Sequence, residues 1–155
     1  MIKRIVIQST ILLFVLCPFL LTGACAQSCE KVVRDVNLRL SPAIDEPELV
    51  EILRNLNHTN NKKLPMKFVN KQTARSRGWK PGKDLWSVNA LKGSSIGGDR
   101  FRNLEGRLPD HKWREADLDY QGGHRGGKRL VFSRDGVRFV TVNHYKTFTE
   151  VPPCR

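Results

Sequence analysis

The chain has 155 residues, and its 27 lysines and arginines outnumber 15 aspartates and glutamates, which makes the formal net charge +12. The length suits one domain with a modest core, and the chain has no internal repeats or low-complexity blocks, so multidomain and repeat arrangements are excluded. A protein this basic is expected to meet a polyanion, namely a nucleic acid, an anionic glycan or a membrane surface, and charge alone does not choose among them.

Residues 1–26 have the layout of a secretory signal peptide. A short basic start precedes a mostly apolar run and then small residues at positions 24–26. An A-x-A site of this kind favours cleavage between Ala26 and Gln27. We therefore expect a secreted, extracellular protein with a net charge of +10, because the segment removed holds two basic residues and no acidic one.

Two other interpretations of this segment are weaker. An uncleaved membrane anchor is disfavoured because Pro18 and the polar residues 8–10 interrupt the apolar run. Lipoprotein anchoring at Cys25 is disfavoured because a large aliphatic residue is expected three places before the cysteine, where Thr22 stands.

Two cysteines remain after cleavage, one near each end of the mature chain. In an oxidising compartment they predict a single disulfide between Cys29 and Cys154. A metal site is not predicted, because Cys25 and Cys29 lack CxxC spacing and the histidines show no ligand pairing. We expect no metal and no cofactor.

The first half of the mature chain predicts helices. Residues 27–44 are polar and are expected to form an irregular N-terminal extension. Residues 45–58 begin with acids and a proline and predict a helix with one apolar face, made of Leu49, Ile52, Leu53 and Leu56. Two short helices are also expected: one over 71–77, with Asn70 as its N-cap, and one near 83–88. Asn57 opens a glycosylation sequon, which matters only in a cell with that machinery.

After Gly93 the pattern changes to strands separated by glycine, proline and Asp-Gly turns. The predicted strands are 96–102, 113–119, 129–134, 136–142 and 147–151. Helices followed by strands indicate an α+β fold, with N-terminal helices packed on one side of a five-stranded antiparallel sheet. Residues 45–155 are expected to form this single domain.

Gly122 to Arg129 comes close to a phosphate-binding loop but does not match one. Arg129 stands where a serine or threonine should hold magnesium, and a strand follows instead of a helix. A glycine-rich hairpin loop is the better interpretation, and its positive charge from Arg125, Lys128 and Arg129 still needs an explanation.

The strand over 112–120 gathers acidic residues on one face, which is unusual in so basic a chain. If this strand and the one after the loop are antiparallel neighbours, Arg125 and Arg129 lie near Glu115 and Asp117. A salt-bridge cluster without function explains this arrangement as well as an active site does, since exposed ion pairs are common.

His144 shifts the balance toward chemistry because it can reach the same face from the end of the next strand. A glutamate can accept the proton of an RNA 2′-hydroxyl, a histidine can protonate the departing 5′-oxygen, and cations can stabilise the phosphate. The alternative is a catalytically silent RNA- or polyanion-binding protein. A membrane-active protein ranks low, because the mature chain lacks a long amphipathic basic helix, and no stable membrane association is expected.

Five segments resemble the small secreted guanyl-preferring ribonucleases of the barnase and binase type. The resemblance runs from about Leu64 to Glu150. It rests on LPMKFVNKQTARSRGW, SSIGGDRFRNLEGRLP, WREADLDY, HRGGKRLVFSRDG and NHYKTFTEV. The resemblance implies N-terminal helices against a five-stranded antiparallel sheet, and an enzyme that cleaves single-stranded RNA through a 2′,3′-cyclic phosphate without a metal.

The resemblance also implies roles for individual residues. Glu115 matches the general base and His144 the general acid. Asp117 matches the carboxylate that holds the arginines in place, and Tyr145 matches a tyrosine lining the site. Cations around the scissile phosphate are matched by Lys71, Arg125 and Arg129. Asp119 is assigned no role.

The base-recognition loop matches less closely. Its residues are Phe101, Arg102, Asn103, Leu104, Glu105 and Gly106. Glu105 matches the carboxylate that binds the guanine edge, and the backbone N–H groups of Asn103 and Leu104 can donate to the guanine carbonyl. Leu104 replaces an arginine of the family, and Arg102 is expected to point away and not to substitute for it. The family further implies a small acidic protein inhibitor as a partner, and the protein is expected to be a monomer.

Overall fold

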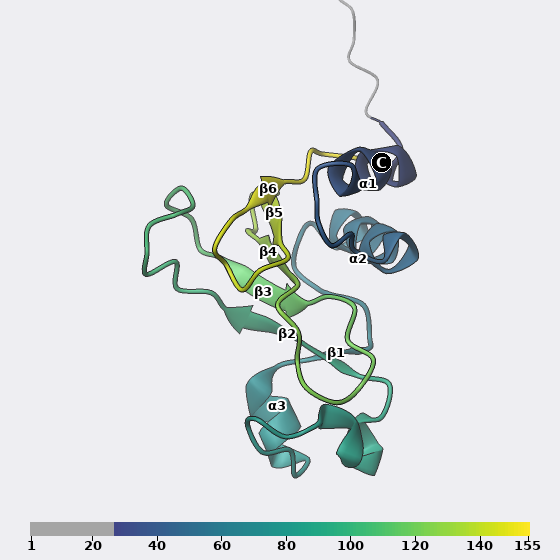
Figure 1. The fold of residues 1–155 in the computed structure, drawn as a ribbon, viewed down its shortest axis with the longest axis vertical. Coiled ribbons are helices and arrows are strands. Elements are labelled where there is room, and N and C mark those ends of the chain that lie inside the picture. Colours follow the sequence, from purple (N-terminus) through teal and green to yellow (C-terminus); the bar gives the residue numbers. More distant parts are fainter. Residues whose placement is uncertain (1–26) are drawn as a thin grey trace, which may run out of the picture.

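The structure is a computed structural model that describes residues 27–155 (Figure 1). The predicted signal peptide, with the lipoprotein site at Cys25, lies outside the described residues. In chain order the elements are α1 (Cys29–Asn37), α2 (Glu46–His58), β1 (Phe68–Val69), α3 (Lys71–Ser76), two 3₁₀ turns (Leu85–Ser87 and Asn89–Leu91), β2 (Ser95–Arg100), β3 (Arg114–Asp117), β4 (Arg129–Phe132), β5 (Arg138–Thr141) and β6 (Thr149–Glu150).

Helix α2 confirms the strongest of the predicted helices. Asp45 caps it by accepting a hydrogen bond from Glu48 N at 2.8 Å, and Pro47 stands in its first turn, where its missing N–H costs nothing. The four apolar residues of the predicted face are fully buried: Leu49, Ile52, Leu53 and Leu56. The spacing of those residues therefore predicted both the helix and the face that it buries.

The prediction of an irregular segment over 27–44 was wrong, because α1 occupies Cys29–Asn37. Val32, Val33 and Val36 are buried with Cys29 at helical spacing and pack in the same core cluster as α2. Valine is a poor helix former, but packing of an apolar stripe outweighs this weak preference. The 27–44 segment is therefore part of the main core.

The sheet has six strands in the order β1-β2-β3-β4-β5-β6. Five correspond to predicted strands, with shorter ends, and their pairings are antiparallel as expected. The additional strand is β1, which pairs parallel with β2. With two residues, β1 is too short to show an alternating pattern, which explains why the sequence did not indicate it.

The sheet separates a face covered by helices from the face that carries the candidate site. Leu130 and Phe132 pack in one cluster with α1 and α2, whereas Val131 packs with Trp113 on the opposite face. Glu115 is paired with Val131 in the register, so it lies on the face away from these helices. Helices α1 and α2 lie side by side next to the sheet, and α3 lies at the far end near β1 and β2 (Figure 1). No helix among residues 27–155 is long and apolar enough to cross a membrane.

A disulfide joins the two ends of the described chain, as predicted. The Cys29–Cys154 S–S distance is 2.03 Å, and Asn57 packs beside it. Asn57 Nδ2 donates to the Cys154 carbonyl at 2.9 Å, and Arg138 Nη2 donates to Asn57 Oδ1 at 2.8 Å. Arg138 is buried, and burial lowers the pKa of its guanidinium. A glycan on Asn57 would replace one of the two hydrogens of Nδ2, beside the disulfide and the Cys154 carbonyl.

Replacement of Asn57 by alanine is expected to lower the free energy of unfolding by about 1–3 kcal/mol, because the Cys154 carbonyl loses the donor Asn57 and the buried Arg138 keeps only Asn61 as an acceptor for Nη2. Urea denaturation followed by circular dichroism measures this change. His58→Ala, at the neighbouring exposed position, is the control and should stay within about 0.5 kcal/mol of wild type. Equal stability of the two variants would contradict a structural role for Asn57.

Candidate active site

Two carboxylates on β3 form the centre of the candidate site. Glu115 and Asp117 are 7% and 2% exposed, and they share the face of the sheet away from α1 and α2. Asp119 lies beyond the strand with a φ of 57°, where its carboxylate accepts hydrogen bonds from Asp45 N and Lys128 Nζ. Asp119 therefore belongs to the fold, and the acidic cluster seen in the sequence is divided between two environments.

The Glu115 carboxylate is held by donors from two distant segments. Lys71 Nζ lies 2.8 Å from Oε1, and the Tyr145 hydroxyl donates to Oε2 at 2.7 Å. Asn70 caps α3 and so places Lys71 at the start of that helix, where its backbone N–H donates to Asp99. Burial, and then the hydrogen bond to Glu115, raise the pKa of Tyr145 above its ordinary value, which keeps the hydroxyl protonated as a donor.

Asp117 anchors two arginines beside Glu115. Arg125 makes a two-point contact, with Nε 2.5 Å from Oδ2 and Nη2 2.7 Å from Oδ1. Arg129 is itself buried, and its Nε forms an ion pair with Asp117 Oδ1 at 2.9 Å, without hydrogen-bond geometry. Burial alone would lower the pKa of Arg125, but the attraction of Asp117 and then Glu115 outweighs it and raises the pKa. These contacts place fixed positive charge on the surface next to Glu115.

His144 lies in the turn after β5 with a positive φ of 53°, followed by Tyr145 at 64°. Its backbone N–H donates to the Gly127 carbonyl at 3.1 Å. A Cβ added at Gly127 would lie 2.7 Å from His144 Nδ1, so the imidazole packs against this glycine. Thr141 Oγ1 accepts from Tyr145 N at 3.1 Å and helps to hold the turn. Positive φ at two consecutive non-glycine residues is costly and is often found at functional sites.

A hollow of about 260 Å³ lies beside His144 and Tyr145. It is lined by Phe101, Arg102, Asn103, Leu104, Glu105, Arg107, His144, Tyr145 and Phe148. The structure therefore brings the predicted base-recognition loop next to the predicted general acid. Arg102, which the sequence analysis expected to point away, also lines the hollow. Leu104 is 85% exposed.

The recognition loop is shaped by its own side chains. Asn103 has a φ of 47°, and its amide bonds both the N–H and the carbonyl of Leu108, at 3.1 Å and 2.7 Å. Gly106 has a φ of 61°, a conformation that suits glycine. Phe101 stacks on Tyr145 with ring centroids 5.0 Å apart. The loop is thereby closed on itself and attached to the segment that carries His144.

Sequence reasoning missed two residues of this hollow, Arg107 and Phe148. The Nε of Arg107 lies 2.9 Å from Glu105 Oε2, and its Nη1 donates to the Lys146 carbonyl. The sequence did contain a signal for Arg107, because this cation stands two residues after the carboxylate of Glu105, with Gly106 between them.

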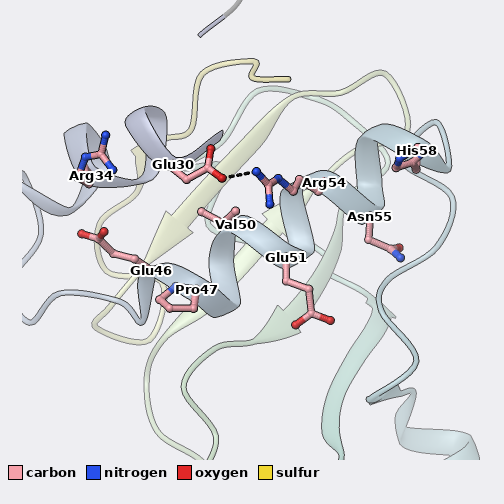
Figure 2. Close-up of a pocket in the computed structure, with 9 residues that line it drawn as sticks. All are labelled: Glu30, Arg34, Glu46, Pro47, Val50, Glu51, Arg54, Asn55 and His58. Carbon is pink, nitrogen blue, oxygen red and sulfur yellow. Dashed lines mark hydrogen bonds and ion pairs between the residues drawn. The ribbon is translucent and has the colours of Figure 1, made fainter. Parts of the chain in front are cut away.

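Two further features bear on what the site is. Among the described residues, no three His, Cys, Asp or Glu side chains gather as a metal site would require. Another hollow, of about 580 Å³, lies between α1 and α2 and shares no lining residue with the hollow beside His144. There Glu30 and Arg54 pair across the two helices, and the surrounding side chains have mixed charge (Figure 2). This helix groove also carries carboxylates, two arginines and His58, but none of its carboxylates is buried as Glu115 and Asp117 are.

Comparison with known proteins finds clear relatives. A family model described as ribonuclease matches residues 54–152. Two proteins named ribonuclease, from Bacillus intermedius and Bacillus pumilus, are each 44% identical over 93 residues, which cover 58% of this chain and 57% of each relative. A ribonuclease of Heyndrickxia coagulans is 43% identical over 93 residues, or 58% of this chain and 84% of that protein. The chain thus spans a little over half the length of the first two relatives.

Proposed function

Because this chain belongs to the microbial ribonuclease family, we propose that it is an endoribonuclease that cleaves single-stranded RNA, preferentially after guanosine. One observation carries the proposal. Glu115, with its two donors, lies beside the Asp117-held arginines, and Tyr145 links this group to the hollow next to His144. A carboxylate, an imidazole and fixed cations around one surface suit transphosphorylation of RNA without a metal.

The first step converts the phosphodiester into a 2′,3′-cyclic phosphate. Glu115 accepts the proton of the 2′-hydroxyl as the 2′-oxygen attacks phosphorus, and His144 donates a proton to the departing 5′-oxygen. In the second step the roles reverse, since His144 takes a proton from water and Glu115 returns one to the 2′-oxygen. The first step needs a deprotonated acid and a protonated histidine, so its rate should show a bell-shaped pH dependence.

The cations stabilise the charge that develops on the phosphate. Lys71, Arg125 and Arg129 surround the carboxylates, and Asp117 orients the two arginines. Because a guanidinium held in place needs no reorganisation during the reaction, its stabilisation of the transition state is larger than that of a mobile one. The same charges attract RNA, so the rate should fall as salt is added.

Guanine preference is assigned to the loop that lines the hollow. Glu105 can accept hydrogen bonds from the guanine N1–H and amino groups, and backbone N–H groups of Asn103 and Leu104 can donate to its carbonyl oxygen. Adenine presents no matching pattern on this edge, and a site built for hydrogen bonding discriminates strongly against a base that leaves its groups unpaired. The aromatic rings of Phe101 and Tyr145 offer apolar surface to the base.

The test uses residues 27–155 with the dinucleotides GpA, ApA, UpA and CpA in the presence of EDTA. GpA should be cleaved at least about tenfold faster than the others and should give a cyclic phosphate product. Comparable rates for all four would remove guanine preference and keep the enzyme. Tight RNA binding without cleavage would instead indicate a silent binding protein, and a requirement for magnesium would overturn the mechanism.

We also propose that the protein works outside the cytoplasm and is held in check by a small acidic inhibitor. The buried disulfide suits an oxidising compartment. A cluster of cations around a surface site is the complement that an acidic inhibitor would need.

A further inference from the structure

Arg107 makes polar contacts with two walls of the hollow beside His144. Its Nε pairs with Glu105 Oε2 at 2.9 Å, within the recognition loop. Its Nη1 donates to the backbone carbonyl of Lys146, in the segment that follows His144 and Tyr145. The guanidinium therefore joins the carboxylate proposed to read the base to the segment that carries the proposed general acid.

We propose that Arg107 is the positioning residue for base recognition, a role that rests on the proposed function. Its guanidinium holds the Glu105 carboxylate at the hollow and fixes the position of the base-recognition loop relative to residues 144–148. Through Glu105, Arg107 affects binding of the hydrogen-bonding edge of guanine.

The surroundings of Glu105 explain why such a residue is needed. The Glu105 side chain is 67% exposed, and a glutamate that far in solvent loses rotamer freedom when it binds a base. Leu104, beside it, is apolar and cannot pair with the carboxylate. Among residues 27–155, Arg107 alone forms an ion pair with Glu105. A carboxylate already oriented by a planar guanidinium binds its ligand at a smaller entropic cost.

The solvent exposure of the Arg107–Glu105 ion pair distinguishes a role in base recognition from a role in folding stability. The Arg107 side chain is 44% exposed, and ion pairs of this kind contribute little to folding. Loss of Arg107 should therefore change base choice and leave the stability of the protein almost unchanged.

The test compares Arg107→Gln with wild type by measuring kcat/KM for GpA and ApA. The GpA to ApA ratio should fall about fivefold to tenfold, because the rotamer freedom of one side chain that must be ordered on binding is worth a factor of this order. Arg134→Gln, which removes an exposed arginine in the turn between β4 and β5, is the charge-matched control and should leave the ratio unchanged. The conservative variant Arg107→Lys should recover part of the lost ratio.

A double-mutant cycle decides whether Arg107 acts through Glu105. In a Glu105→Gln background, Arg107→Gln should not lower the ratio further. An unchanged ratio in Arg107→Gln, or equal losses for both substrates, would overturn the inference while the proposed function stands. Failure of the wild-type protein to cleave any dinucleotide would instead overturn the proposed function, and the inference with it.

Discussion

Replacement of Glu115 by glutamine is expected to lower kcat for GpA cleavage by on the order of 10²–10⁴-fold, with little change in KM. Glutamine keeps the size of the side chain, and its amide oxygen can still accept the hydrogen bond from Lys71 Nζ, while its amide nitrogen can donate to the Tyr145 hydroxyl oxygen. It cannot take a proton from the 2′-hydroxyl. The loss should therefore fall on the chemical step, measured by steady-state kinetics together with RNA affinity.

Glu51→Gln provides the matched control for this substitution. Glu51 is exposed on α2 and lies in the helix groove of Figure 2. Its replacement by glutamine removes the same charge as Glu115→Gln, but at a position outside the candidate active site. Its kinetics should equal those of wild type. If Glu115→Gln were as active as Glu51→Gln, Glu115 would be only a partner in a salt bridge.

Replacement of Asp117 by alanine is expected to lower the free energy of unfolding by about 3–5 kcal/mol, because it leaves a buried charge without its partner. Arg129 is 4% exposed and has Asp117 as its ion-pair partner. Arg125 would lose both hydrogen bonds that fix its orientation. Urea denaturation at neutral pH measures the change, and activity should also fall because the two arginines lose their alignment.

Asp35→Ala is the control, because it measures how much stability is lost when an exposed ion pair is removed. Asp35 pairs with Lys31 on the exposed side of α1, with both side chains about half exposed. Its removal should change the free energy of unfolding by less than about 1 kcal/mol. A similar small change for Asp117→Ala would mean that water solvates the arginines and that the buried carboxylate does not hold them.

Local sequence patterns predicted most of the elements that support the site. The apolar spacing in α2, its acidic first turn and its proline all act within a few residues, and the helix formed at the expected place. The Asn70 cap likewise predicted α3 and thereby the position of Lys71. A short turn over residues 133–137 joins β4 to its antiparallel neighbour β5, whereas longer loops join β2 to β3 and β3 to β4.

Elements that depend on distant contacts were missed. Helix α1 forms from valines with weak helical preference because they pack on α2 and because Cys29 is bonded to Cys154. Strand β1 exists only because Phe68 and Val69 lie next to β2. No local pattern reports the pairing of β1, whereas a local signal for α1 was present and was overlooked: a serine N-cap followed by apolar residues at helical spacing, namely Cys29, Val32, Val33 and Val36.

The same division applies to the site. The sequence by itself determined the residue types, and the alternation along β3 determined that Glu115 and Asp117 share a face. Only the tertiary structure decided that Tyr145 donates to Glu115 and that Arg107 joins the recognition loop to the segment after His144. Alternation is a property of one strand, whereas these hydrogen bonds join groups 30 and 39 residues apart in the chain. Their geometry depends on how the sheet twists and how its loops close, which no local sequence pattern specifies.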